Sequence, residues 1–239
     1  MRRSWIMARF LIRDLFHSLA GVVPLAAALA FGIIAFEYGM DQAQFVIVAG
    51  IGIGTICLLT TLLLASRVNR ASSYPLLARL HRRAELLMAL VLSGLVITIV
   101  LATLITAANL FTGRLTLDFP SALWIVPTWL ILWLLAATLA LPLSALVSRG
   151  GSHLAGYVVL TALLLANDRK AMLATRGWDW LARVVTFILW PVSTLLSRAS
   201  DGIHDQSYWL SLALTLAYAN LLFLLATRLL EDKDLLWTE

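Results

Sequence analysis

Long apolar runs constrain this chain more than any other feature of its sequence. The stretches 45–65 and 86–111 contain no charged residue, and each is long enough to cross a bilayer, which takes about 20 residues. Of the 239 residues, 61% are hydrophobic and 13% are charged, and a soluble fold of this size does not hide so much apolar surface. We therefore predict an all-α polytopic membrane protein with a single transmembrane domain over residues 1–239.

Six transmembrane helices are predicted, with an additional segment before the last one. The apolar part of that segment, 184–196, falls short of the about 20 residues that a span needs, and Pro191 interrupts it. We predict a re-entrant or interfacial segment over 178–196. Counting 184–196 as a seventh span is the alternative, and it moves the C-terminus to the other side. The six predicted spans cover about 19–36, 45–65, 86–111, 122–147, 153–166 and 208–227.

The N-terminal residues 1–18 are amphipathic. On a helix, Arg9 and Arg13 fall on one face, and Leu11 and Leu15 fall towards the other. This pattern predicts an N-terminal interfacial helix that lies on the membrane surface before the first span. The alternative is that these residues form the beginning of the first span.

The distribution of Lys and Arg predicts the orientation. With both termini cytoplasmic, twelve of the 18 Lys and Arg residues lie inside, as the positive-inside rule requires. The formal net charge of +5 is therefore a matter of topology, and it does not indicate nucleic-acid binding. We expect a multi-pass protein of the plasma (inner) membrane whose surroundings are the lipid bilayer.

A basic loop, residues 66–85, separates the second and third predicted spans. Its centre, 72–80, is a short amphipathic piece, and Pro75 is placed to start a helical turn. We predict that this short helix faces a partner at the membrane surface. Glu85, at the start of the next span, is expected to pair with Arg82 or Arg83 as a solvated ion pair. The arginines of the loop are Arg67, Arg70, Arg79, Arg82 and Arg83.

The spans carry no pattern that is typical of catalysis or of cofactor binding. Ionisable residues inside a membrane mark functional sites, and the cores of these spans are nearly free of them. The sequence has no zinc-binding cluster of Cys and His, no HExxH and no Walker A motif. We predict a non-catalytic subunit without cofactor or metal. The four histidines lie near span ends or in loops: His17, His81, His153 and His204.

A pair of glycines in the second span predicts close helix packing. Gly50 and Gly54 are four residues apart in the sequence, so they lie on one face of the helix. Small residues at this spacing let neighbouring helices approach closely in membranes.

The whole set of features resembles the ABC-2 type permease, the membrane subunit of a class of ABC transporters. The features are the amphipathic N-terminal segment, six spans, the basic loop with Pro75, the broken segment 178–196 and a charged tail from Arg228. The resemblance implies that 72–80 is the coupling helix, which docks on a separate ATPase. It assigns the docking residues Ser73, Tyr74, Pro75, Leu76, Leu77, Arg79, Arg82, Arg83 and Glu85.

The resemblance also implies a function and partners. The chain would pair with a second copy or a related permease, as a homodimer or heterodimer, and with two copies of the ABC ATPase subunit. ATP hydrolysis would belong to that partner, and the transport would be export. The mostly uncharged spans suggest a hydrophobic or amphipathic substrate, or a lipid. The alternative is a non-transporting structural or anchor subunit of a larger membrane complex. An intramembrane enzyme is a third hypothesis, which the lack of buried catalytic residues disfavours.

Overall fold

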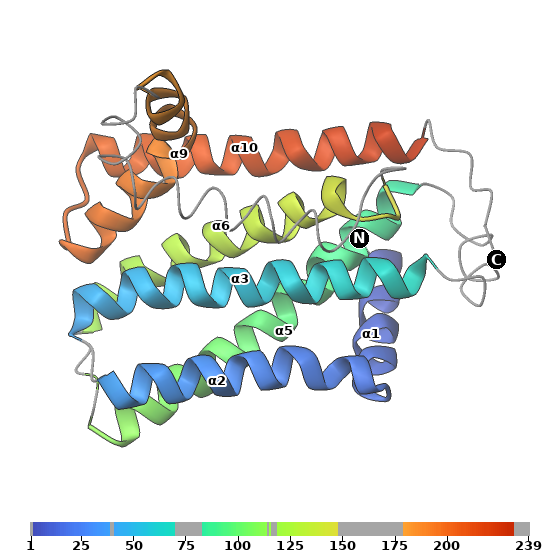
Figure 1. Cartoon of the computed structure of the whole chain (residues 1–239), viewed down its shortest axis with the longest axis horizontal. Coiled ribbons are helices and arrows are strands. Elements are labelled where there is room, and N and C mark those ends of the chain that lie inside the picture. The colour runs from blue at the N-terminus through green and yellow to red at the C-terminus, as the bar shows by residue number, and fades with distance from the viewer. Residues whose placement is uncertain are drawn as a thin grey trace.

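The computed structural model is helical in the part of the chain that it describes, namely residues 2–38, 41–69, 83–113, 115, 119–147 and 179–231. The elements are α1 Arg2–Phe16, a short 3-10 helix η1 Leu19–Gly21, α2 Val22–Tyr38, α3 Gln42–Val68, α5 Arg83–Phe111, α6 Phe119–Leu143, α9 Asp179–Ser200 and α10 Gln206–Glu231 (Figure 1). No strand is present among these residues, which confirms the predicted all-α class.

Five of the described helices are long and apolar enough to cross a membrane. The predicted span 153–166 lies outside the described residues, so the total of six remains a prediction. The described helix α6 ends at Leu143, before the predicted end at residue 147. Pro142 lies next to this end, and proline disfavours the continuation of a helix. The five helices cover Leu19–Glu37, Gln42–Val68, Arg83–Phe111, Leu123–Leu143 and Gln206–Glu231.

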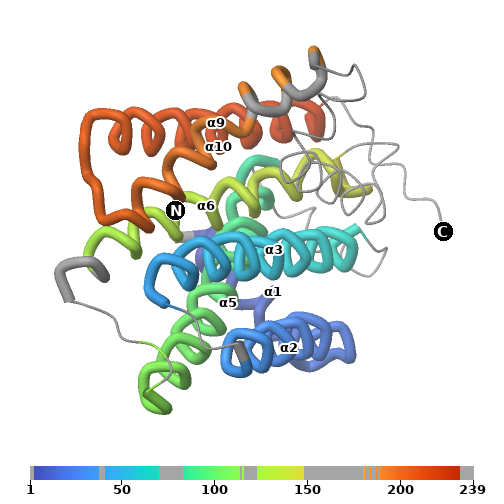
Figure 2. The backbone as a smooth tube through the Cα atoms, turned by 60° about the vertical axis from the view of Figure 1, so that its left-hand side comes forward, coloured from blue at the N-terminus to red at the C-terminus, as the bar shows by residue number. Residues whose placement is uncertain are grey.

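Helix α3 lies at the centre of the bundle, where it packs against α2, α5, α6 and α9 (Figures 1 and 2). Near the start of α3, the Val46 carbonyl accepts a hydrogen bond from Nε1 of Trp129 in the first half of α6, at 3.0 Å. Tyr208, near the start of α10, packs against Trp124 in the same part of α6. Helices α3, α6 and α10 therefore run in the same direction, and α5 is antiparallel to them.

Helix α1 is separate from the first span and lies crosswise over one end of the bundle (Figure 1). The chain turns at Ser18, which has an extended backbone, and α2 begins after η1. Gly21 is needed at this corner because a Cβ there would lie 2.7 Å from the Leu15 carbonyl oxygen. Met7, Leu11 and Leu15 of α1 are buried in the core. The structure thus has a helix at Arg2–Phe16 that is distinct from α2, and its place at a membrane interface remains a prediction.

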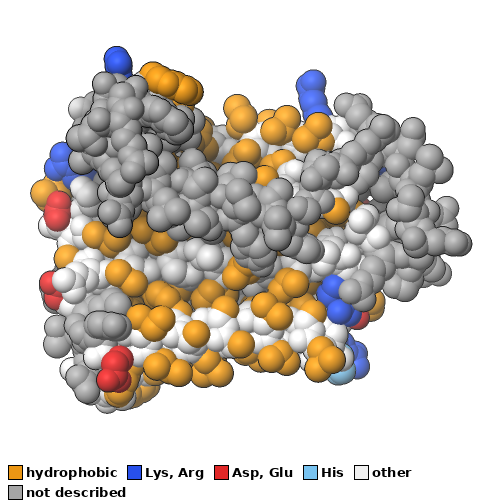
Figure 3. Space-filling model, viewed as in Figure 1, with side chains coloured by type: hydrophobic (Ala, Val, Ile, Leu, Met, Phe, Trp, Pro, Cys, Tyr) orange, Lys and Arg blue, Asp and Glu red, His pale blue; other side chains and the backbone are white. Residues whose placement is uncertain are grey.

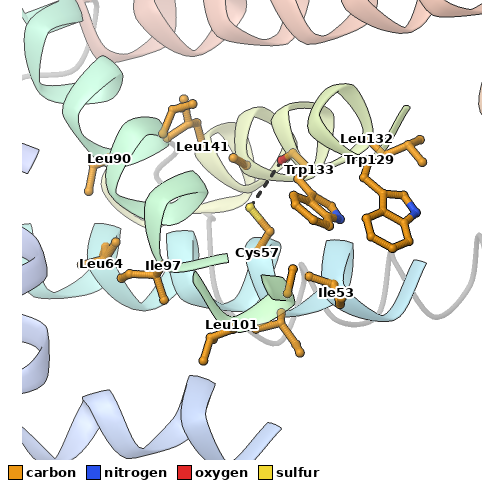
Figure 4. Close-up of a cluster of buried hydrophobic side chains, with 14 of the residues drawn as sticks. Ile53, Cys57, Leu64, Leu90, Ile97, Leu101, Trp129, Leu132, Trp133 and Leu141 are labelled. Atoms are coloured by element: carbon orange, nitrogen blue, oxygen red, sulfur yellow. Dashed lines mark hydrogen bonds between the residues drawn. The ribbon is translucent and has the colours of Figure 1, made fainter. Parts of the chain in front are cut away.

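Glycines bring the neighbours of α3 close to its backbone. A Cβ on Gly50 would lie 2.9 Å from a methyl group of Leu196 in α9, and a Cβ on Gly52 would lie 2.3 Å from the ring of Phe31 in α2. Of the predicted packing pair, Gly50 therefore lies in close contact with its neighbour, whereas a Cβ on Gly54 would meet nothing closer than 3.7 Å. Around the same helix, the buried apolar core includes Ile53, Cys57, Leu64, Leu90, Ile97, Leu101, Trp129, Leu132, Trp133 and Leu141 (Figure 4).

Candidate functional site: the basic end of the bundle

Charged side chains gather at the two ends of the bundle, and apolar side chains cover the length between them (Figure 3). We call the end that α1 crosses the α1 end. Among the described side chains, the opposite end carries four acidic residues, Glu37, Asp41, Asp201 and Asp205, with Arg183 and Arg198. The α1 end carries the acidic residues Asp14, Glu85 and Glu231, and the basic residues Arg3, Arg9, Arg13, Arg67, Arg83 and Arg228.

An ion pair ties α1 to the end of α3. Nε and Nη2 of Arg67 donate to Oδ2 of Asp14 at 2.9 and 2.7 Å. The Arg67 side chain is 19% exposed and that of Asp14 is 45% exposed, so the pair is partly shielded from solvent. Local sequence patterns do not predict this contact because the two residues are 53 positions apart. Arg67 thus has a structural role in addition to its contribution to the charge of the loop.

A second arginine ties the start of α5 to the end of α10. Nη1 of Arg83 donates to the carbonyl oxygens of Leu230 and Glu231, the latter at 3.1 Å. The last carbonyls of a helix have no partner within it, and they carry the negative end of the helix dipole. A guanidinium therefore satisfies them well. Arg83 was predicted to dock a partner, and the structure shows that it also caps α10.

These two contacts fix the end of α3 and the start of α5, the helices that flank the predicted coupling loop. We call Asp14, Arg67, Arg83 and the Leu230 carbonyl the loop frame. Of the predicted docking residues, Arg83 and Glu85 are described, and Oε2 of Glu85 is buried without a hydrogen-bond partner in the described chain. The predicted ion pair of Glu85 with Arg82 or Arg83 remains a prediction, because Arg82 is not described. The docking residues that lie outside the described residues are Ser73, Tyr74, Pro75, Leu76, Leu77, Arg79 and Arg82.

An aromatic cluster occupies the opposite end of the bundle. The rings of Trp124 and His204 have centroids 4.2 Å apart, and Tyr208 and Trp209 pack against Trp124 edge to face. The Tyr208 hydroxyl lies 3.0 Å from Oγ1 of Thr128, so one hydroxyl donates to the other. This cluster was not predicted from the sequence, because only the packing of α6 against α10 brings these residues together.

The interior of the described spans offers little for acid–base chemistry. Buried hydroxyls such as those of Thr60 and Thr61 donate to carbonyls of their own helix, at 2.7 and 2.9 Å. Within the described ranges, no group of three His, Cys, Asp or Glu side chains is placed to hold a metal ion. The features of the described chain that remain available for function are therefore the charged ends of the bundle.

Together, the fold and its charge pattern define a class: an all-helical membrane protein with five described helices able to cross a bilayer and a basic end organised around a loop. No protein-family model, curated protein or solved structure with which the chain was compared matches it.

Proposed function

We propose that the chain is the transmembrane permease subunit of an ABC transporter of the ABC-2 type. It exports a hydrophobic or amphipathic substrate, and a separate ATPase subunit drives the movement. The loop frame is the observation that carries this proposal, because it links the segment between α3 and α5 to four helices of the bundle.

The physical requirement for such a subunit is rigid transmission of movement. If 72–80 is the coupling helix, a push from the ATPase reaches α3 and α5 directly through the chain. The Asp14–Arg67 pair passes it to α1, and the Arg83–Leu230 hydrogen bond passes it to α10. A loop without these contacts would absorb the movement locally, whereas packed helices move as rigid bodies.

The direction of the helices supports six spans. Helix α6 ends at the α1 end, and α10 begins at the opposite end, beside the start of α6. We include the predicted span near 153–166, which would come between α6 and α9 in the chain and return it towards the opposite end. In this proposal the α1 end is cytoplasmic, since most of the described arginines lie there, and both termini are inside the plasma (inner) membrane.

Two apolar helix surfaces suit the proposed interfacial segments. On α1, Trp5, Ile6 and Phe10 are exposed beside Arg9, a combination that fits the boundary between lipid and water. Helix α9 exposes Trp180, Phe187 and Trp190, and tryptophan is enriched at membrane interfaces. We therefore include an interfacial α1 and a re-entrant or interfacial α9 in the proposal.

Co-purification tests the proposal. The intact chain, purified in mild detergent, should bring down a cytoplasmic nucleotide-binding subunit. Leu76→Asp or Leu77→Asp should abolish this association, because a carboxylate would be buried in an apolar contact. Ile203→Asp is the matched control, since Ile203 is exposed at the opposite end and should leave the association intact.

A stable complex without any nucleotide-binding subunit would overturn the permease proposal and favour the structural or anchor subunit. Substrate-stimulated ATP hydrolysis that is unchanged in Leu76→Asp would overturn the docking role of 72–80 alone. The homodimeric and heterodimeric forms are distinguished in the same purification, because a second permease chain appears only in the latter.

A further inference from the structure

The exposed face of α1 carries arginines that have no acidic partner among the described residues. Arg9 and Arg13 are one turn apart, so they lie on the same face of the helix, and Arg3 is exposed as well. The salt bridges of the described chain involve none of these three side chains. Asp14, the one acidic residue of α1, is bonded to Arg67. The outward charge of α1 is therefore positive, and no described side chain neutralises it.

Large apolar side chains share this exposed face. Trp5 lies one turn before Arg9 in the same row, and Ile6 and Phe10 form the next row of the helix. The side chains of Trp5, Ile6 and Phe10 are 53%, 61% and 52% exposed. Arginines beside tryptophan and other large apolar residues are typical of a helix that lies on a membrane surface.

The opposite face of α1 is fixed to the bundle. Met7 and Leu11 are buried in the core, and Ala8 is fully buried. The Ala8 carbonyl accepts a hydrogen bond from Oγ of Ser93 in α5, at 3.2 Å. One face of α1 thus packs on the protein, and the face with Arg9 and Arg13 is left to the surroundings.

The contact between α1 and α5 gives the depth of α1 in a bilayer. Ser93 lies about 15 Å along α5 from its start at Arg83. The stretch of α5 from Ser93 to Phe111 covers about 27 Å, close to the thickness of a hydrocarbon core of about 30 Å. Figure 1 shows α3 and α10 continuing past α1 at this end. Helix α1 therefore lies at the level of the lipid headgroups.

We propose that the exposed face of α1 binds anionic phospholipids, with the headgroup phosphate held by Arg9 and Arg13. A guanidinium binds phosphate through two parallel hydrogen bonds, and basic residues near an anionic leaflet are attracted to it. Trp5, Ile6 and Phe10 lie against the glycerol and the upper part of the acyl chains. This inference rests on the interfacial α1 of the proposed function and adds the class of lipid that α1 selects.

Other occupants fit this face less well. A zwitterionic lipid has no net charge, so the arginines attract it less. Free phosphate would leave the apolar side chains of the face uncovered. An acidic segment of a cytoplasmic protein would have to reach past the ends of α3 and α5 to the level of the headgroups, where lipid already surrounds the bundle.

Photolabelling by lipids tests the proposal. The intact chain would be placed in phosphatidylcholine nanodiscs with a small fraction of a phosphatidylglycerol that carries a diazirine at the start of one acyl chain. A phosphatidylcholine with the same diazirine is the comparison, because only the headgroup differs. We expect the anionic probe to label α1 at least about fivefold more than the neutral probe. This excess should be lost at about 1 M salt, where charges are screened beyond about 3 Å.

The labelled positions would be mapped on chymotryptic peptides, because substitution of arginine does not alter these cleavage sites. Arg9→Gln and Arg13→Gln should each lower labelling by the anionic probe about fivefold and leave labelling by the neutral probe unchanged. Arg9→Lys keeps the charge and should retain most of the labelling. Arg228→Gln is the matched control, because Arg228 is an exposed arginine at the same end but on α10. Equal unfolding temperatures would first show that each variant is folded.

Equal labelling of α1 by the two probes would overturn the proposal and leave an interfacial α1 intact. No labelling of α1 by either probe would overturn the interfacial placement as well. An equal loss in Arg228→Gln and Arg9→Gln would show an effect of overall charge and not of this face.

A fourth outcome would point to a protein partner. If Arg9→Gln leaves lipid labelling unchanged but weakens co-purification of a nucleotide-binding subunit, the face binds protein and the lipid proposal is wrong. Labelling in nanodiscs needs no ATPase, so failure of this proposal and failure of the permease proposal are observed in separate experiments.

Discussion

At the scale of single residues, Asp14 and Arg67 show how a charge acquires a specific role. The partly shielded, two-point contact holds α1 on α3. We predict that Asp14→Asn lowers the free energy of unfolding by about 1 kcal/mol, a modest value because Asp14 is 45% exposed. Cys57 provides the readout: it is the sole cysteine and is buried, so a thiol-reactive dye reports its exposure on heating.

A double-mutant cycle provides the control for this ion pair. Once Arg67→Ala is present, Asp14→Asn should cost almost nothing further, because its partner is already gone. If the two losses simply add, the pair does not couple the helices, and the loop frame loses its link to α1.

Asp205 makes the stability of the opposite end depend on pH. A hydrogen bond from the Ser207 hydroxyl at 2.6 Å, then one from the Tyr208 amide at 3.0 Å, lowers the pKa of this carboxyl from its ordinary 3.8. Arg198, 3.4 Å away, contributes in the same direction. Since the pKa is lower in the folded chain, the stabilisation is present above the ordinary pKa and is lost as the pH falls through the folded one.

We therefore predict that Asp205→Ala lowers the unfolding temperature near pH 7 but has little effect at a pH well below the lowered pKa of Asp205, where the carboxyl is protonated in the folded and the unfolded state. Asp201→Ala is a matched control, because Asp201 is exposed four positions earlier and does not cap α10. A difference between Asp205→Ala and the unaltered chain that persists at the lower pH would rule out titration of Asp205 as the cause.

At the scale of helices, α3 and α2 meet through Gly52. A Cβ on Gly52 would lie 2.3 Å from the Phe31 ring, whereas a Cβ on Gly54 would meet nothing closer than 3.7 Å. Gly52→Ala should therefore destabilise the chain by about 1–3 kcal/mol through overpacking. Gly54→Ala should be neutral or slightly stabilising, because alanine favours helix.

The two variants form a pair in one helix, two residues apart, so they differ mainly in what each added methyl group meets. Unfolding temperatures, read from Cys57 exposure, provide the comparison. Phe31→Ala should remove most of the effect of Gly52→Ala, because the ring is then absent. Equal losses from both glycine substitutions would show that the α2–α3 contact is not the cause.

At the scale of the whole molecule, the charged ends predict the topology in the membrane. In a Cys57→Ala background, single cysteines at Glu37 and Asp201 would probe the opposite end, and cysteines at Arg9 and Arg228 would probe the α1 end. We predict that a membrane-impermeant maleimide labels the first two in intact cells and the last two only after permeabilisation. The reverse pattern would place the α1 end outside and remove the proposed access to a cytoplasmic ATPase.

The sequence alone determined the class and much of the helix layout. Long uncharged runs have to form helices in a bilayer, because every backbone N–H and C=O must be bonded within the segment. The break between residues 1–18 and the first span was also readable, since the charge pattern changes there. These features depend on residues that are close in the chain, so local physics decides them.

Only the tertiary structure decided which residues work together. Arg67 and Asp14 are 53 positions apart, and Arg83 and Leu230 are 147 apart, so no local pattern separates these arginines from others in the loop. Side-chain contacts between helices depend on how each helix is rotated about its axis and on the angle at which two helices cross, and packing sets both. The apolar runs specify only that the helices exist.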